Sequence, residues 1–491
     1  MSTFNIKYAF ILSSLLHIIF PLNLVKFPFK REINVTSNDK PSEIMSKIFF
    51  NNMITTVKIG SPETQRITVS ISLQKYPFYI VSSQFLNNKT ISDFYSERSL
   101  ENFYFLNESK SKSLEIKENF TNFTHIHQDF KRAKGARDTI DFGSSKEKMN
   151  FLLVSEMNFA FYLKSEGNIG LNLYNNDKST DKYNDYNFIT QLKRSGLISS
   201  YNFYIKFKDQ KDIFMSEGEL IIGPDLDYVQ KDIKKQAHKI NADKNLYNEI
   251  KWALDFKIIY INNYPYRLYT PTLFLYELGV IKANTNALNL FESLFFKKYI
   301  DKNVCFTDVF NIDNFDGFSE DNFDLKFNGE YKFYYCKSET EIAYNQFPNL
   351  TFYHNSFNFN ITFTYQDLFI EVNGYKIFLI VGSFKDTDWA FGAPFFRKYD
   401  TVFNFDEKSI CVFDGEVKEE KGDRKESGEK SESLNKVEGK FILVVALFVI
   451  VFVILCVILI KTCRLIPRKQ KANELEEEFS YKENRYVMNN N

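Results

Sequence analysis

The chain has 491 residues, and its 62 lysines and arginines balance its 62 aspartates and glutamates, so the formal net charge is zero. A protein that binds nucleic acid through electrostatics would carry a basic excess or a basic face, so this balance argues against that class. The hydrophobic fraction of 44% and the aromatic fraction of 17% suit a globular chain with a large core. The length is enough for about two or three domains.

An apolar run from Tyr8 to Phe20 follows Lys7 near the start of the chain. A short basic start followed by such a run is typical of a secretory signal peptide, which we assign to residues 1–22. A buried N-terminal strand and a membrane anchor are the alternatives, but the run is too short to span a bilayer. We therefore expect the protein to enter the secretory route.

A second apolar run, Phe441–Ile460, contains 20 residues without one polar side chain. As a helix it would be about 30 Å long, which matches the hydrocarbon core of a bilayer and predicts a transmembrane helix at 440–461. The charged stretch 416–439 lacks aromatic residues and should form a flexible stalk. Basic residues after the run predict a cytosolic tail at 462–491. They are Lys461, Arg464, Arg468, Lys469 and Lys471.

These two runs predict a single-pass type I membrane protein of the secretory pathway or the cell surface, with a lumenal or extracellular ectodomain. In that oxidising compartment we expect a disulfide between Cys305 and Cys336, which leaves Cys411 over. The ectodomain also contains seven Asn-x-Ser/Thr sequences that permit N-glycosylation. They are Asn34, Asn88, Asn107, Asn119, Asn122, Asn349 and Asn360.

The ectodomain consists mainly of short apolar or alternating segments separated by glycine and proline, a pattern that predicts strands. Helical periodicity is clearest at Phe188–Ser195 and Ala287–Tyr299. Many short strands with a few helices predict a two-lobed all-β protein. The expected strands are Met53–Ile59, Arg66–Ser72, Tyr76–Ser82, Asn150–Val154, Asn202–Phe207, Leu220–Ile222, Trp252–Tyr260, Ile377–Val381 and Thr401–Phe405.

Six segments of the ectodomain, in the same order along the chain, resemble motifs of the pepsin-like aspartic proteases (peptidase A1 type). Val57–Pro62 with Gln65 is similar to that family's opening hairpin, and Phe78–Ser82 is similar to its L-W-V-x-S segment. The closest match is Trp389–Asp406, which is similar to W-x-L-G-x-x-F-L-R-x-Y-x-x-V-F-D. The other three are Glu166–Leu171, Phe188–Ile198 and Gly218–Asp225.

The resemblance implies an all-β, bilobal fold with a deep cleft between an N-terminal lobe at 46–235 and a C-terminal lobe at 236–415. It supports the pairing of Cys305 with Cys336, because the family often has a bridge there. It also makes residues 23–45 a candidate remnant of the family's activation segment, since Val25–Arg31 is a basic stretch with a proline. An edge strand retained for folding is the alternative that we favour for this stretch.

In active members of the family each lobe contributes one aspartate from a D-[ST]-G loop, and the two carboxyls share a proton. This chain contains neither D-T-G nor D-S-G. The family spacing from Gln65 places Ser72 at the first position, and Glu277, followed by Leu278, stands at the second. A serine hydroxyl cannot accept the proton of the attacking water, so we predict that both catalytic positions are degenerate.

Other sites are weakly indicated. The family's flap is not recognisable within Ile116–Arg137, where His125 and Phe130 are the candidates. His125 and His127 would share a strand face as a metal pair, but no third ligand stands at a suitable spacing. The acid-rich stretch Asp308–Asp324 fits no calcium-loop template. We therefore predict neither a metal site nor a cofactor.

Three functions follow from these observations. The first is a membrane-anchored pseudoprotease whose monomeric ectodomain binds a peptide or protein ligand through the cleft, without hydrolysing it. The second is an active but divergent aspartic endopeptidase, in which an acid from elsewhere would meet Glu277. The third is an unrelated β-rich cell-surface receptor. Motifs of other hydrolases and of nucleotide-binding proteins, such as H-E-x-x-H, G-x-S-x-G and G-x-G-x-x-G, do not occur in the chain.

Overall fold

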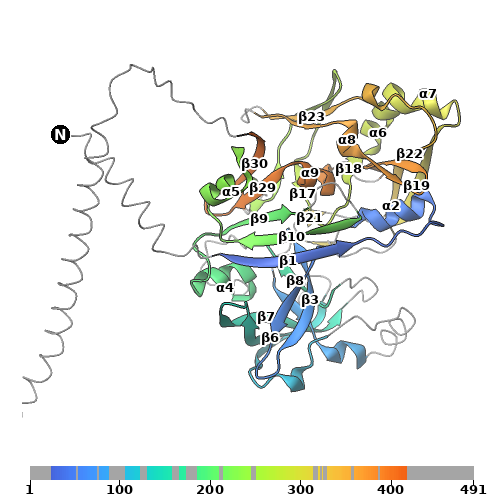
Figure 1. Cartoon of the computed structure of the whole chain (residues 1–491). Helices are drawn as coiled ribbons and strands as arrows, with labels where there is room; N and C mark the ends of the chain where they lie inside the picture. The colour runs from blue at the N-terminus through green and yellow to red at the C-terminus, as the bar shows by residue number, and fades with distance from the viewer. Residues whose placement is uncertain are drawn as a thin grey trace, which may run out of the picture. The chain divides into compact units, whose positions relative to one another are not determined.

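Short strands dominate the computed structural model, as the sequence pattern predicts (Figure 1). The predicted signal peptide, transmembrane helix and cytosolic tail, and nearly all of the stalk, lie outside the described residues. Among the residues that are described, no helix is long and apolar enough to cross a membrane. The structure describes residues 24–50, 53–73, 77–87, 105–121, 130–157, 165–172, 185–208, 214–244, 250–312, 319–320, 323–324, 329–354, 359–384 and 388–416.

The described residues all fall in one compact unit that ends at Val417, and a second unit, Lys418–Asn491, lies outside them. The first half of the compact unit contains β1 (Val25–Glu32), α2 (Pro41–Phe49), β2 (Ile54–Ile59), β3 (Gln65–Ser72), β4 (Tyr79–Val81), η1 (Ser83–Asn87), η3 (Glu108–Lys110), β5 (Glu115–Thr121), β6 (Phe130–Asp141), β7 (Lys146–Met157), β8 (Gly167–Gly170), α4 (Phe188–Arg194), β9 (Asn202–Phe207) and β10 (Met215–Ile222).

The second half contains more and shorter elements. They are α5 (Leu226–Ile233), β11 (Lys235–Asn241), β12 (Asp243–Lys244), β13 (Ile250–Lys251), β14 (Ala253–Leu254), β15 (Ile258–Ile261), β16 (Tyr264–Arg267), β17 (Thr272–Phe274), β18 (Ile281–Asn284), α6 (Thr285–Phe291), η6 (Glu292–Phe296), α7 (Lys297–Ile300), β19 (Cys305–Ile312), β20 (Ser319–Glu320), β21 (Phe323–Asp324), β22 (Gly329–Lys337), η7 (Tyr344–Gln346), β23 (Leu350–Tyr353), β24 (Ile361–Phe363), α8 (Tyr365–Leu368), β25 (Phe369–Val372), β26 (Tyr375–Phe378), β27 (Ile380–Ser383), β28 (Ala390–Phe391), α9 (Ala393–Lys398), β29 (Asp400–Asn404) and β30 (Ser409–Glu416).

A run of antiparallel strands in the largest sheet joins the two halves of the chain (Figure 1). Its order is β1-β10-β9 from the first half, followed by β29-β30-β11 from the second. The halves meet where β9 pairs with β29, with Phe203 opposite Phe403. The rings of these two residues stack with their centroids 5.1 Å apart. We call this run of strands the platform.

The same pattern of strand pairing occurs once in each half of the chain. In the first half, β3 pairs in parallel with β8, β8 pairs antiparallel with β4, and β4 pairs in parallel with β7. In the second half, β17, β28, β18 and β27 repeat that sequence of parallel, antiparallel and parallel pairs. The two halves are therefore topological repeats that meet on the platform.

The N-terminal strand β1 is not an edge strand, which corrects the interpretation that we favoured from the sequence. All eight residues of β1 pair with β10, and Phe29 and Lys30 pair with β2 on the other side. Alternate side chains of β1, including Phe27 and Phe29, are buried in the main core. This burial explains why the stretch alternates apolar residues with lysine, because successive side chains point to opposite faces.

Helix α2, which follows β1, belongs to a second core cluster. Proline occupies its first turn, and the carboxylate of Glu43 accepts the backbone N–H of Lys40 at 2.8 Å, which fixes the start of the helix. Ile44, Ile48 and Phe49 on one face are completely buried against residues of the second half. Each such side chain contributes about 1.5–3 kcal/mol of burial free energy, so α2 is held firmly.

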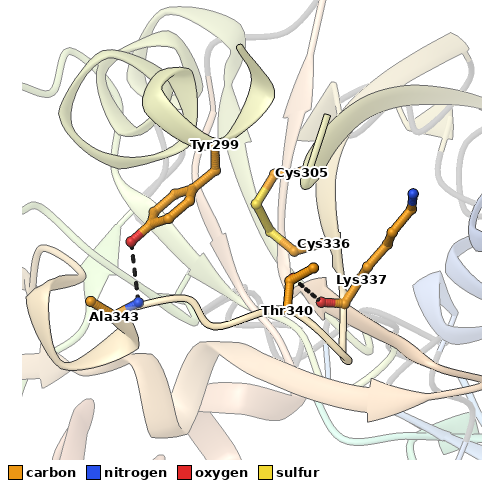
Figure 2. Close-up of a disulfide and its surroundings, with 6 residues drawn as sticks. All are labelled: Tyr299, Cys305, Cys336, Lys337, Thr340 and Ala343. Carbon is orange, nitrogen blue, oxygen red and sulfur yellow. Dashed lines mark hydrogen bonds between the residues drawn. A yellow bond between two sulfur atoms is a disulfide. The ribbon is translucent and has the colours of Figure 1, made fainter. Parts of the chain in front are cut away.

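The predicted disulfide between Cys305 and Cys336 is confirmed (Figure 2). The two cysteines are direct partners in the β19–β22 register, so the strand pairing places their side chains together. By the chain-entropy estimate, a loop of this length stabilises the fold by about 3–4 kcal/mol. Cys411 is a free, buried cysteine on β30, and burial raises the pKa of its thiol to about 11.

We expect the protein to lose stability in acid, because two of its histidines are half-buried. His238 on β11 stacks on Phe359 with ring centroids 4.4 Å apart, and His354 meets Phe256 edge-on at 6.0 Å. Burial lowers the pKa of both imidazoles below the ordinary value of 6.5. The unfolded chain therefore takes up these protons first. We expect the free energy of unfolding to fall as the pH drops through about 6.5.

The variant His238→Gln tests this expectation. Its free energy of unfolding, measured in urea between about pH 7.5 and about pH 5.5, should fall less steeply than that of the unmodified protein. Gln236→Ala, an exposed change two residues away on the same strand, serves as the control and should keep the original slope. Identical slopes for the His238 variant and the unmodified protein would contradict the assignment.

Candidate functional site

Ser72 and Glu277, the two positions singled out in the sequence, lie in direct contact. Ser72 is the last residue of β3, and Glu277 lies in the turn that follows β17. Both side chains are buried, with 2% and 7% of their surfaces exposed. Residues 205 positions apart in the chain thus meet where the loops of the two topological repeats come together.

One carboxylate oxygen holds the contact. The hydroxyl of Ser72 donates to Oε1 of Glu277 at 2.5 Å, and the backbone N–H of Leu73 donates to the same oxygen at 3.0 Å. Hydrogen bonds to a charged group contribute about 1.5–3 kcal/mol each, more than those between neutral groups. The pair therefore ties the loop of the first half to the loop of the second.

Strand pairing fixes the serine. Ser72 lies opposite Gly170 in the parallel pair of β3 and β8. Its carbonyl accepts a hydrogen bond from the N–H of Leu171 at 2.8 Å. The predicted motif Glu166–Leu171 thus lies beside the serine, and Glu166 itself is buried and accepts the N–H of Thr68 at 2.8 Å.

A tight turn and helix α2 fix the glutamate. The N–H of Leu278 donates to the carbonyl of Leu275 at 3.2 Å, which closes a turn with Glu277 at its third position. The N–H of Gly279 then donates to the carbonyl of Phe49, at the end of α2, at 2.9 Å. A Cβ atom on Gly279 would lie 1.9 Å from the carbonyl oxygen of Ile48, so only glycine allows this approach.

A buried tyrosine lies beside the glutamate. Tyr276 is 2% exposed and packs against Phe396 with ring centroids 4.0 Å apart. Burial raises the pKa of its hydroxyl well above the ordinary value, and the negative charges of Glu277 and Asp400 raise it further. Tyr276 therefore stays neutral, and its ring covers one side of the turn.

The paired strand register stops short of Glu277 in the second half. In the first half the parallel pairing of β3 and β8 includes Ser72 itself, opposite Gly170. In the second half the pairing of β17 and β28 ends at Phe274. Glu277 lies three residues beyond that last pair, so the turn places the glutamate rather than the strand.

This arrangement lacks the parts of a carboxylate dyad. A dyad needs one ionised carboxyl that takes a proton from water and one protonated carboxyl that polarises the substrate carbonyl. Here a neutral hydroxyl and a backbone amide both donate to the oxygen that faces the other repeat. The contact suits a static link between the halves better than it suits proton transfer.

The remaining predicted sites have mixed outcomes. The stretch Ile116–Arg137 contributes to the antiparallel pair of β5 and β6, which has a register shift just after Ile116. Phe130 begins β6, and the pairing of β6 with β7 shifts register directly after it. His125 and His127 lie outside the described residues, as do Asn88 and Asn122. Within the described ranges, no group of three or more His, Cys, Asp or Glu side chains could hold a metal ion.

The described sequons differ in exposure. Asn34, Asn349 and Asn360 are exposed. Asn107 is half-buried. Its Oδ1 accepts the backbone N–H of Ser109 at 3.1 Å and the hydroxyl of Ser109 at 2.7 Å. Asn119 lies within β5.

Sequence reasoning missed Asp138, a fully buried carboxylate on β6. It accepts hydrogen bonds from the hydroxyl of Ser113 and, at 2.7 Å, from the N–H of Thr139. Its buried neighbours on the strand, Ala133 and Ala136, are small, so the stretch lacks the bulky apolar alternation by which a buried strand is identified.

The comparisons with known proteins found no match to any family model and no match among curated proteins. Fold and site geometry therefore carry the functional argument.

Introducing an acid at Ser72 should make stability depend on pH. In Ser72→Asp, two carboxyls would face each other across the contact, and the pair would retain a proton to a higher pH than the unfolded chain does. The free energy of unfolding should then fall by about 1.4 kcal/mol per pH unit above about pH 4, until the shared proton is lost.

The variant Ser72→Asn is the matched control, because asparagine has nearly the same shape and volume as aspartate but carries no charge. Urea unfolding of both variants from about pH 4 to about pH 7 separates the effect of charge from that of size. Parallel pH profiles for the two variants would show that the introduced carboxyl does not face Glu277.

Proposed function

We propose that the protein is a membrane-anchored, catalytically inactive relative of the pepsin-like aspartic proteases. In this proposal the ectodomain binds an extended peptide or an unfolded protein segment in the interlobe cleft that the family resemblance implies. Binding needs the shape and hydrogen-bonding groups of a site, whereas hydrolysis also needs the acid pair. The fold can therefore bind a peptide without hydrolysing it.

The arrangement of strands supports the bilobal part of the proposal. Two topological repeats meet on a platform to which each half contributes three of the strands. The predicted motifs also fall at equivalent places, because Glu166–Leu171 and Trp389–Asp406 supply β8 and β28, the matching strands of the two repeats. This correspondence supports the family resemblance over a fortuitous set of matches in an unrelated receptor.

The observation that carries the proposal is the hydroxyl of Ser72 in the place that hydrolysis requires for an acid. The sequence contains no aspartate or glutamate between Glu63 and Asp93, so no nearby residue of this loop could replace it. The turn of the opening hairpin before it requires its glycine. Gly60 adopts φ +102°, and a Cβ atom there would lie 2.8 Å from the carbonyl of Glu63.

The proposed cellular location rests on the two apolar runs of the sequence and has support from the disulfide. Disulfides persist in secreted and lumenal proteins and are rare in the cytosol. The Cys305–Cys336 bridge is consistent with an ectodomain that faces the lumen or the cell exterior. The stalk and the transmembrane helix would then tether it to the membrane.

A proteolysis assay tests the inactive state. We expect the purified protein to leave denatured haemoglobin and casein uncut from about pH 2.5 to about pH 7, the range in which carboxylate dyads work. Glu277→Gln should give the same background as the unmodified protein. Pepstatin-sensitive cleavage that Glu277→Gln abolishes would instead establish the divergent endopeptidase.

A retention assay tests the binding role. The immobilised protein is incubated with a peptic digest of casein, and retained peptides are identified by mass spectrometry. We expect extended peptides to bind saturably to the native protein and not to the same protein after reduction and denaturation. Equal retention by both forms would show that the folded ectodomain has no peptide site.

A further inference from the structure

The N-terminal segment 25–50, which comprises β1 and α2, is built into both halves of the protein. Strand β1 lies inside the largest sheet, between β10 and β2. Figure 1 shows it beside β10. Beyond the strand, the N–H of Ile33 donates to the carbonyl of Phe214 at 2.8 Å. Pro28 contributes as an acceptor, since its carbonyl receives the hydroxyl of Thr55 at 2.7 Å.

The second part of the segment supports the loop that carries Glu277. Phe49 packs on Tyr331 with ring centroids 4.7 Å apart, and its carbonyl accepts the N–H of Gly279. Phe50 forms an isolated β-bridge with Leu278. The end of α2 therefore contacts both residues that directly follow the glutamate.

We propose that residues 25–50 are a permanent structural element, so that the chain is not matured by removal of this segment. The proposal goes beyond the proposed function, because it concerns processing rather than binding or catalysis. In this proposal β1 belongs permanently to the folded sheet, and α2 positions the turn that carries Glu277.

Chain length gives an independent reason. Only four residues separate the end of α2 at Phe49 from the start of β2 at Ile54. A cut near residue 50 would leave no downstream segment long enough to replace the eight-residue strand β1. The vacated place would expose the edge of β10 that now faces β1 and leave the backbone groups on that edge unpaired.

A cut before α2 meets a different obstacle. The stretch 33–40 contains exposed residues and a turn at 37–38, so a protease could reach it there. Replacement of β1 by α2 would require that helix to unfold and to withdraw Ile44, Ile48 and Phe49 from the second core cluster. We therefore expect a chain cut in this stretch to stay together as a two-chain complex.

Two measurements test the proposal. The first is the N-terminal sequence of the mature full chain, purified from eukaryotic cells. We expect it to begin upstream of Val25, where the predicted signal peptide ends. A mature N-terminus at or beyond residue 33 would overturn the proposal.

The second measurement uses the full chain with the recognition sequence of a site-specific protease inserted between Ser37 and Asn38. After cleavage, we expect both fragments to elute together in size-exclusion chromatography, and to separate in guanidinium chloride. The same chain treated with inactivated protease is the matched control. Loss of the N-terminal fragment from a still-folded remainder would overturn the proposal.

These outcomes are distinct from those that test the proposed function. An uncut N-terminus together with pepstatin-sensitive proteolysis would refute the inactive state and leave the permanent segment standing. Removal of the segment in a protein that shows no proteolysis would refute the permanent segment and leave the inactive state standing.

Discussion

The pairing of β9 with β29 is the constraint on which the rest of the structure depends. It joins strands about 200 residues apart, and Phe203 and Phe403 stack at the junction. Forming so distant a contact costs loop-closure entropy, which the burial of aromatic rings must offset. Trp252 adds to that burial, because its ring packs edge-on against Phe403 at 4.9 Å. With the two halves held in this way, the loops after β3 and β17 can meet.

The contact between Ser72 and Glu277 follows from that junction. A carboxylate buried beside apolar residues is costly unless hydrogen bonds offset its loss of water. The hydroxyl of Ser72 and the N–H of Leu73 supply two such bonds from the opposite half. The link therefore stabilises the way the two halves are held together. In the proposed function, the same contact presents a hydroxyl where hydrolysis would need a second acid.

Local patterns predicted the local structure well. The helix at 188–195 and the end of β3 at Ser72 are where periodicity and spacing placed them, and the Cys305–Cys336 pairing is confirmed. The expected strand Trp252–Tyr260 is instead two short strands, because β14 pairs with β17 whereas β15 pairs with β16 and β23. A continuous apolar run cannot show which partner each of its residues will have.

Long-range geometry could not be predicted in the same way. Counting along the sequence matched Glu277 to the second catalytic position, which lies three residues beyond Phe274, the last paired residue of β17. The turn that Leu275 and Leu278 close, and the end of α2 that holds Gly279, place the glutamate there. Neither contact has a signature in local composition. The turn has no glycine or proline at its centre, and the partner of Gly279 lies more than 200 residues away along the chain. The N-terminal segment thus contributes to how the glutamate is presented, because Phe49 accepts the N–H of Gly279 and Phe50 forms a β-bridge with Leu278.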